Sequence, residues 1–189
     1  CSEKQPAGTR RSAVERMCNA MVHRGPDDAG AWESGEAGVC LGHRRLAILD
    51  TGAAARQPMV SPDGRYVLVY NGECYNYRQL RQDLMAQGVT FVSNGDTEAV
   101  LHWLIRYGSA GVGKLRGMFA LALWDDVEKT LLLARDPFGI KPLYVCRNKD
   151  QGFLFASEVR AALASGMVER VVDPVALQEY ISYGFVPEP

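Results

Sequence analysis

The sequence predicts an α+β fold built as a four-layer αββα sandwich, in which two antiparallel sheets pack on each other and helices cover their outer faces. Connections of about five residues join consecutive strands, and such loops join antiparallel neighbours because a parallel link needs a crossover. The strands YVLVY, MFALALW and TLLLA are apolar almost throughout. An antiparallel strand with one wet face alternates apolar and polar residues, so both faces of these strands must be covered. A three-layer arrangement with one mixed sheet is the alternative.

The bulk composition is that of one ordinary domain, or at most two small ones. The chain has 189 residues, of which 47% are hydrophobic and 23% charged, with a formal net charge of -1. This near-neutral balance argues against a nucleic-acid or membrane-surface partner. No apolar stretch approaches the roughly 20 residues that span a bilayer. The polar start CSEKQPAG is neither a signal peptide nor an amphipathic transit segment.

The cysteines and histidines predict no metal site and no disulfide framework. The five cysteines are odd in number and scattered without a CxxC pair, and the three histidines show no ligand spacing. We therefore expect a reducing, cytoplasmic setting. Four cysteines read as small apolar residues in helices and strands. Cys1 differs because it stands at the terminus.

The first half of the chain alternates helices with short strands. Apolar residues at helical spacing predict amphipathic helices over 10–22 and 76–86, and Gly88 ends the second of them. A third helix is expected to begin with Asp96 or Thr97 as its N-cap. The other elements expected here are strands near Ala31 and over 38–49, 66–70 and 89–92, with a turn at 61–64.

The second half predicts two hairpins followed by two helices. The strands 118–124 and 130–135 are joined through DDVEK, and 142–146 and 152–156 through RNKDQ. A short helix begins near Ser157, and another begins at Asp173-Pro174, where proline suits the first helical position. We assign 1–180 to one domain and 181–189, which is rich in proline, to the start of a linker.

Cys1 is the first candidate for chemistry. An N-terminal cysteine combines a nucleophilic thiol with its own base, the free α-amine, whose unperturbed pKa of about 8 is close to neutrality. Such a site needs no histidine, which suits this chain. The alternative is that the cysteine stands at the terminus through an accident of expression or processing.

Asn71, Gly72 and Glu73 follow the apolar strand 66–70 directly. Asn-Gly is a strong turn signal, because both residues tolerate positive φ. The same pair could also present a side-chain amide and an unobstructed backbone N–H to a developing negative charge. The residues alone leave both interpretations open.

Two further groups could bind a charged ligand. Arg44 and Arg45 stand side by side in an apolar strand, where they point to opposite faces, so that one of them points inward. An inward arginine could hold a carboxylate through two parallel hydrogen bonds or form a structural ion pair. Asp96 could cap its helix or face a substrate ammonium.

Seven motifs occur here in one order: HRGPDDAG, LGHRRLAILD, YNGECYNY, GDTEAV, GMFALALWD, LARDPFGIKPLY and FASEVRAAL. Together they resemble the glutaminase domain of class II glutamine amidotransferases, and most closely the N-terminal half of glutamine-dependent asparagine synthetase. The resemblance covers roughly Val14 to the end of the chain. It implies the N-terminal-nucleophile hydrolase fold, an αββα sandwich that agrees with the strand argument.

The resemblance also implies roles for individual residues. Cys1 would attack the side-chain amide of L-glutamine, with its α-amine as general base, to form a thioester and release ammonia. The Asn71 side chain and the Gly72 backbone N–H would form the oxyanion hole. Glutamine itself would be bound by a further set of side chains: Arg45 at its α-carboxylate, Asp96 and Glu73 at its α-ammonium, and Ile48.

For partners and cofactors, the resemblance implies a second domain outside this sequence. That synthetase domain would use ATP and Mg²⁺ to activate aspartate and would receive the ammonia, whereas the glutaminase domain itself would need no cofactor. A homodimer is a further expectation.

One departure from the family leaves alternatives open. The family begins Cys-Gly-Ile and continues as a buried strand, whereas Cys1 is followed here by the polar, proline-containing SEKQP. The alternatives are a non-catalytic domain that binds glutamine without cleaving it, or a glutaminase that serves another acceptor, such as a sugar phosphate, a purine precursor, an antibiotic or a peptide.

Overall fold

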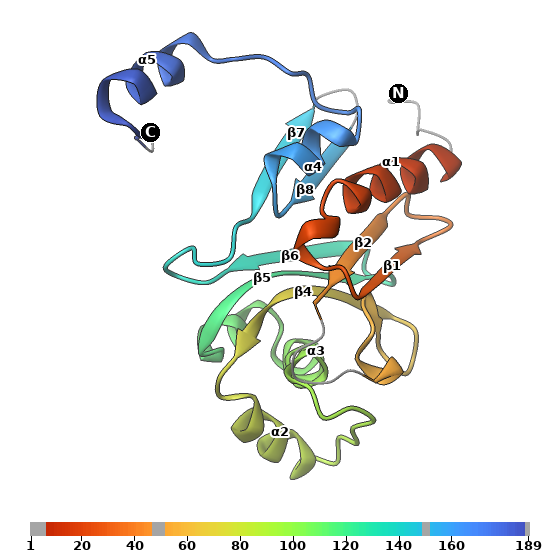
Figure 1. Ribbon diagram of the computed structural model, residues 1–189. Helices are drawn as coiled ribbons and strands as arrows, with labels where there is room; N and C mark the ends of the chain where they lie inside the picture. The colour runs from red at the N-terminus through yellow and green to blue at the C-terminus, as the bar shows by residue number, and fades with distance from the viewer. Residues whose placement is uncertain (1–6, 47–51, 149–151, 188–189) are drawn as a thin grey trace.

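The fold is described by a computed structural model over residues 7–46, 52–148 and 152–187. Its larger sheet has four antiparallel strands in the order β3-β4-β5-β6, of which β4, β5 and β6 are seen side by side in Figure 1. These strands are β3 (Met59–Val60), β4 (Tyr66–Cys74), β5 (Gly117–Asp125) and β6 (Thr130–Arg135). The register pairs Tyr66 with Asp125 and Cys74 with Gly117, so β4 and β5 are hydrogen-bonded along their whole length.

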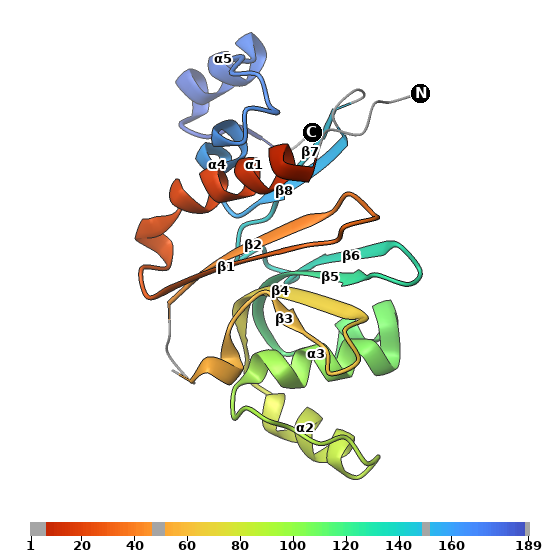
Figure 2. The same ribbon diagram turned by 90° about the vertical axis from the view of Figure 1, so that its right-hand side faces the viewer.

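The second layer of strands consists, within the described residues, of two antiparallel pairs. They are β1 (Asp28–Glu33) with β2 (Cys40–Arg45), and β7 (Tyr144–Asn148) with β8 (Gly152–Ala156). Both pairs lie on the same side of the four-stranded sheet (Figure 2). The predicted second sheet is therefore present but divided.

Helices cover the outer faces of both strand layers. On the outside of the four-stranded sheet lie α2 (Tyr77–Met85) and α3 (Asp96–Tyr107), and on the other side lie α1 (Ala7–Asn19) and α4 (Val159–Ala164) (Figure 2). Short 3₁₀ segments occur at η1 (Val22–Arg24), η2 (Ala53–Ala55) and η3 (Gly108–Lys114). The order helix, sheet, sheet, helix confirms the predicted four-layer sandwich.

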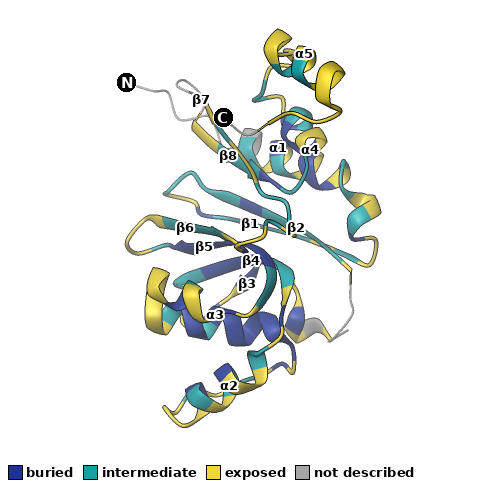
Figure 3. Cartoon of the chain, turned by 90° about the vertical axis from the view of Figure 1, so that its left-hand side faces the viewer, coloured by how far each residue is buried: buried dark blue, intermediate teal, exposed yellow. Residues whose placement is uncertain are grey.

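Strand β4 shows why its sequence is apolar on both faces. Leu68 and Tyr70 pack with residues of α2 and α3 in one core, whereas Val67 and Val69 pack with Leu41 of β2 in the core between the two strand layers. Buried residues accordingly lie on both sides of this sheet (Figure 3).

The structure corrects the expected boundary of β4. The strand continues through Asn71 and Gly72 to Cys74, and these residues pair with β5 throughout. The turn interpretation of Asn-Gly is therefore wrong. Pairing with a neighbouring strand has overridden the local turn preference of the two residues.

The expected strand 89–92 is also wrong. In the described part of the chain no strand pairs with this segment, and its backbone groups have other partners. The N–H groups of Val92 and Ser93 donate to the Glu98 carboxylate at 2.9 and 2.7 Å, while Phe91 lies 4.1 Å below the Arg81 guanidinium. A side chain at the start of α3 thus replaces the missing strand partner.

The last helix, α5 (Pro174–Tyr183), lies apart from the sandwich at the end of an extended segment (Figure 1). Asp173 is its N-cap and accepts hydrogen bonds from the N–H groups of Val175 and Ala176, so the predicted start is confirmed. None of its residues is buried. No helix among the described residues is both long and apolar enough to cross a membrane.

Candidate active site

The ends of β2 and β4 and the start of α3 enclose a cavity of about 410 Å³. Six of the residues singled out in the sequence line it: Arg44, Arg45, Asn71, Gly72, Glu73 and Asp96. These residues are up to 52 positions apart in the chain, and only the packing of the two strand layers brings them together. We refer to this space as the polar cavity.

Strand β2 directs alternate side chains to the two sides of its layer. Leu41 faces the four-stranded sheet, and His43 lies on the same face and bonds the carbonyl of Tyr70. Arg45 continues this face along the polar cavity, and its Nη1 donates to the carbonyl of Gly52 at 3.4 Å. Arg44 also lines the cavity, but alternation places it on the opposite face of β2, where it donates to the carbonyl of Gly25 at 2.8 Å. Alternation along the strand therefore makes Arg45 the inward arginine of the pair.

Strand β4 supplies three candidate groups in a row. Asn71 and Glu73 share the face of Val69, which is the face toward β2. Gly72 lies so close to β5 that an added Cβ would come within 2.5 Å of the Met118 carbonyl oxygen and 2.7 Å of the Phe119 Cβ. Only glycine fits here without a shift of the backbone.

The direction of the Gly72 N–H follows from the pairing of its neighbours. Tyr66 and Tyr70 direct their backbone groups to the β3 side: the Tyr66 carbonyl accepts from Ser61 N–H at 2.9 Å, and Tyr70 N–H donates to Gln57 Oε1 at 2.6 Å. Alternate residues of an antiparallel strand direct their backbone groups to the same side. The Gly72 N–H therefore points past the end of β3, into the polar cavity.

Asp96 is built into the wall of this cavity. Its Oδ2 accepts the Cys74 N–H at 2.8 Å and the Tyr70 hydroxyl at 3.4 Å. Burial raises the pKa of Asp96, and the hydrogen bonds from Cys74 and Tyr70 partly oppose this rise. Gly95 is the N-cap of α3 and Asp96 is its first residue, so the prediction of Asp96 or Thr97 as N-cap is corrected by one position.

The charges around the polar cavity suit an amino acid. Arg45 lies on one wall, while Glu73 and Asp96 come from the β4 and α3 walls. An arginine can grip a carboxylate and two carboxylates can hold an ammonium, while the Asn71 amide and Gly72 N–H could both donate to an oxygen.

Two residues of the cavity were missed by the sequence interpretation. His43 and Gln57 both bond the carbonyl of Tyr70, at 3.2 and 3.0 Å. Burial lowers the pKa of His43 to about 4. The position of His43, two residues before Arg45 on an alternating strand, was a usable signal; Gln57 offered none.

Cys1 and Ile48 lie outside the described residues. Among the described cysteines, burial raises the pKa of Cys74 and of Cys40 to about 11 and raises that of Cys18 as well. Because the thiolate is the nucleophile, these three thiols are poorly reactive near neutral pH.

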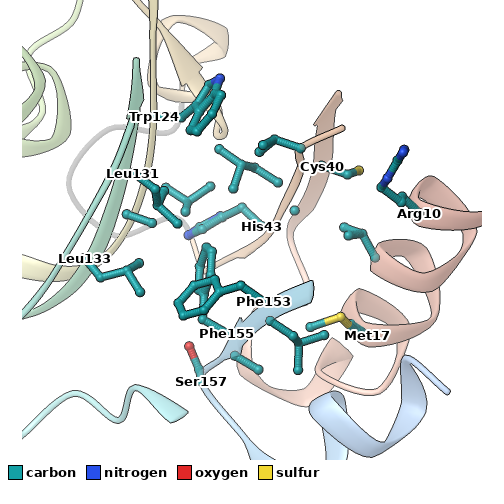
Figure 4. Close-up of a pocket in the computed structure, with 18 of the residues that line it drawn as sticks. Arg10, Met17, Cys40, His43, Trp124, Leu131, Leu133, Phe153, Phe155 and Ser157 are labelled. Carbon is teal, nitrogen blue, oxygen red and sulfur yellow. The ribbon is translucent and has the colours of Figure 1, made fainter. Parts of the chain in front are cut away.

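A larger apolar cavity of about 830 Å³ adjoins the polar one, and His43, Tyr70 and Asn71 line both. It lies between β2 and β8, with Met17 of α1, Leu133 of β6 and Phe155 of β8 among its walls (Figure 4). His43 projects into it. This cavity occupies the division between the two strand pairs of the second layer.

Comparison with known proteins identifies the family. A family model described as "Glutamine amidotransferase domain" matches residues 2–189. A Mycobacterium tuberculosis H37Rv protein, provisionally named a glutamine-hydrolysing asparagine synthetase, is 44% identical over 94% of this chain and 29% of its own length. Glutamine-hydrolysing asparagine synthetase 1 of Bacillus subtilis 168 is 43% identical over 93% of this chain and 27% of its own.

The fold has a solved counterpart. Glutamine phosphoribosylpyrophosphate amidotransferase from B. subtilis superposes with a TM-score of 0.67 and 26% identity, over 82% of this chain and 41% of that one. This chain spans less than a third of the length of the curated relatives named above. From the motifs, the four-layer fold and these matches together, the chain belongs to the glutamine amidotransferase domain family.

Proposed function

We propose that this chain hydrolyses L-glutamine to glutamate and ammonia through a cysteinyl thioester, and that the ammonia serves the synthesis of asparagine. The observation that carries the proposal is the convergence of Arg45, Asn71, Gly72, Glu73 and Asp96 on one cavity. These groups match both ends of a free amino acid and the oxyanion that its side-chain amide would form.

The proposed chemistry has two halves. The Cys1 thiol, deprotonated by its own α-amine, attacks the glutamine side-chain carbonyl carbon, and the oxyanion accepts hydrogen bonds from the Asn71 amide and the Gly72 N–H. The tetrahedral species collapses to a thioester, and the amide nitrogen leaves as ammonia after taking up a proton. Water then attacks the thioester to give glutamate and regenerate the thiol.

Substrate binding is assigned to the charged walls. Arg45 would hold the α-carboxylate, Asp96 and Glu73 would face the α-ammonium, and Ile48 would contact the substrate. Asp96 already accepts two hydrogen bonds at Oδ2, so a contact to the ammonium would add to a fixed carboxylate. A fixed carboxylate costs less entropy on binding than a mobile one.

The acceptor of the ammonia is proposed from the relatives. The proteins that match here over less than a third of their length are named glutamine-hydrolysing asparagine synthetases. We therefore propose a C-terminal synthetase domain as the partner, where ATP and Mg²⁺ would activate aspartate. A homodimer and a cytoplasmic location are part of the same proposal.

The test is covalent labelling with a glutamine-like electrophile, 6-diazo-5-oxo-L-norleucine, followed by intact mass and peptide mapping. We expect one adduct, on Cys1, and protection by L-glutamine but not by D-glutamine. Cys74 is a built-in control, because its thiol has a pKa raised to about 11 by burial. An adduct on Cys74, or none, would refute the nucleophile assignment. Glutamine binding without glutamate production would favour the non-catalytic alternative.

A further inference from the structure

We propose that Gln57, assisted by His43, is a positioning residue that aims the Gly72 N–H and the Asn71 amide at the oxyanion; this inference rests on the proposed function. Neither side chain is assigned a contact with the substrate. Each acts through the backbone of Tyr70, the residue that precedes the two donors.

Gln57 takes the place of a strand residue. In the β3–β4 ladder Met59 pairs with Leu68 and Val60 with Val67, and continuing this register places Gln57 opposite Tyr70. The backbone of β3 begins only at Met59. The Gln57 side chain makes both bonds of the next rung instead: Oε1 accepts from Tyr70 N–H at 2.6 Å, and Nε2 donates to the Tyr70 carbonyl at 3.0 Å.

His43 adds a second donor to the same carbonyl. A carbonyl oxygen can only accept, so the His43 nitrogen at 3.2 Å, Nε2, carries the proton. Burial keeps the ring neutral near pH 7, because the pKa of His43 is lowered to about 4. The Tyr70 peptide is thus held by groups from β2 and from the segment before β3, in addition to the pairing with β5.

The consequence for Gly72 is geometric. Its N–H lies on the same edge of β4 as the bonded groups of Tyr70 and Cys74. Tyr70 is fixed by Gln57, and Cys74 N–H is fixed by Asp96 at 2.8 Å. The donor is therefore bracketed on both sides, while β3 has ended and leaves this part of the edge facing the polar cavity. If the backbone of β3 extended past Gln57 to the next hydrogen-bonded rung, it would pair with this edge of β4 and occupy the Gly72 N–H.

The packing around Gln57 supports this reading. An added Cβ at Gly30 of β1 would collide with the carbonyl oxygen of Gln57, so β1 approaches the Gln57 backbone closely. His43 pairs with the same Gly30 in the β1–β2 ladder. The backbones of the two residues that hold Tyr70 are thereby both placed next to a single glycine.

The test compares Gln57→Met with Gln79→Met. The first substitution keeps the length of the side chain and removes both hydrogen-bonding groups. The control removes an exposed glutamine of α2 that bonds Asp83. For glutamine hydrolysis we expect Gln57→Met to lower kcat about tenfold to a hundredfold with KM within about twofold, and Gln79→Met to leave both unchanged. An unchanged kcat in Gln57→Met, or a loss confined to KM, would overturn the proposal.

A second reaction separates positioning from general loosening of the site. Alkylation of Cys1 by iodoacetamide is a displacement that forms no oxyanion, so its rate, read by peptide mapping, should be the same in Gln57→Met and the wild type. A parallel fall in alkylation and hydrolysis would show a merely structural role. A wild-type chain that is alkylated but never hydrolyses glutamine would refute the proposed function instead.

Gln57→Glu covers the case in which Gln57→Met does not fold. A protonated carboxyl donates and accepts as the amide does, whereas an ionised one cannot donate to the Tyr70 carbonyl. The ratio of variant to wild-type kcat should therefore fall as pH rises through the titration of the new carboxyl, measured from pH 5 to pH 8. In the wild type His43 is neutral across this range, because burial lowers its pKa to about 4, and Arg45, Glu73 and Asp96 are common to both proteins. A pH-independent ratio near one would count against the positioning role.

Discussion

At the scale of single residues, the lining of the polar cavity depends on which face of its strand each side chain occupies, because successive side chains of a strand alternate between the two faces. Arg44 and Arg45 are adjacent and chemically identical, yet they lie on opposite faces of β2, where Arg44 bonds the carbonyl of Gly25 and Arg45 that of Gly52. The same alternation separates Tyr70, which packs against α3, from Asn71, which faces β2. A shift of either strand by one residue would exchange these roles.

Substitution of Arg45 directly tests its proposed bond to the α-carboxylate of glutamine. Arg45→Ala removes a charge-assisted, two-point partner worth roughly 1.5–3 kcal/mol. We expect the KM for glutamine to rise about ten- to a hundredfold, with an unfolding midpoint in urea close to that of the wild type. Arg45→Lys keeps the positive charge but lacks the two parallel N–H donors of the guanidinium, so its KM should lie between those of the wild type and Arg45→Ala.

Arg44→Ala is the matched control for this experiment. It removes the neighbouring guanidinium, which lies on the opposite face of β2 from Arg45 and bonds the carbonyl of Gly25, and should leave the glutamine KM nearly unchanged. A large fall in the urea midpoint of Arg45→Ala would assign that residue a structural role and contradict its proposed bond to the substrate carboxylate.

At the scale of elements, β4 is held at both ends by charged side chains. At its start Arg65 pairs with Asp125 of β5 through two contacts of 2.9 and 2.6 Å. Asp125 also accepts the N–H groups of Val127 and Glu128 in the β5–β6 turn. At the other end Asp96 holds Cys74. The strand that carries the proposed oxyanion donors is thus fixed along its length.

The Arg65–Asp125 pair predicts an acid-sensitive contribution to stability. Hydrogen bonds from Arg65 lower the pKa of Asp125 to about 2, against about 3.9 in an unfolded chain. A carboxyl whose folded pKa is depressed stabilises the fold above the unfolded pKa, and this contribution is lost as pH falls toward the folded value. Asp125→Asn should therefore be destabilised relative to the wild type at pH 6, by roughly 1–2 kcal/mol, and the gap should close toward pH 2.

Urea unfolding between pH 2 and pH 6 measures this difference. Glu169→Gln serves as the control, because Glu169 is exposed and its substitution should leave the pH dependence unaltered. A difference between Asp125→Asn and the wild type that stays constant over the whole range would contradict the assignment.

At the scale of the whole molecule, the sandwich is closed on the side of α2 and α3 but carries an uncovered helix at its other end. Three apolar side chains of α5, Val175, Tyr180 and Ile181, are 64%, 58% and 75% exposed. Exposed apolar residues gathered on one helix lead us to predict contact with another protein unit. The proposed synthetase domain or a second copy of this chain could provide that contact.

We expect the isolated chain to self-associate through α5. Val175→Lys combined with Ile181→Lys should weaken the association about tenfold or more, since each buried aliphatic side chain contributes about 1.5–3 kcal/mol. Sedimentation velocity over a range of concentrations measures the effect. Gln178→Lys with Ser182→Lys adds the same charge to exposed polar positions of the same helix. Equal behaviour of the two double variants would show that added charge on this helix, and not the loss of the Val175 and Ile181 side chains, weakens the association.

The sequence alone determined the local and chemical features of this protein. Uniformly apolar strands and short loops are direct consequences of burial on both faces and of antiparallel pairing, so the four layers could be predicted, as could the capped start of α5 at Asp173. The ordered motifs indicated the family and the candidate residues. The layers and the helix start needed only periodicity, turn chemistry and residue type, whereas the family and the roles of the candidate residues came from the resemblance of the ordered motifs to a known family.

Only the tertiary structure decided what depends on neighbours distant in the chain. Asn71-Gly72 carries a strong turn signal, yet pairing with β5 keeps it in a strand and directs the Gly72 N–H to the polar cavity. The segment 89–92 resembles a strand but bonds to Glu98 instead. Gln57 has no local signature, because its role arises from a register shared with Tyr70. Local propensities amount to fractions of a kcal/mol per residue, and long-range pairing and burial outweigh them.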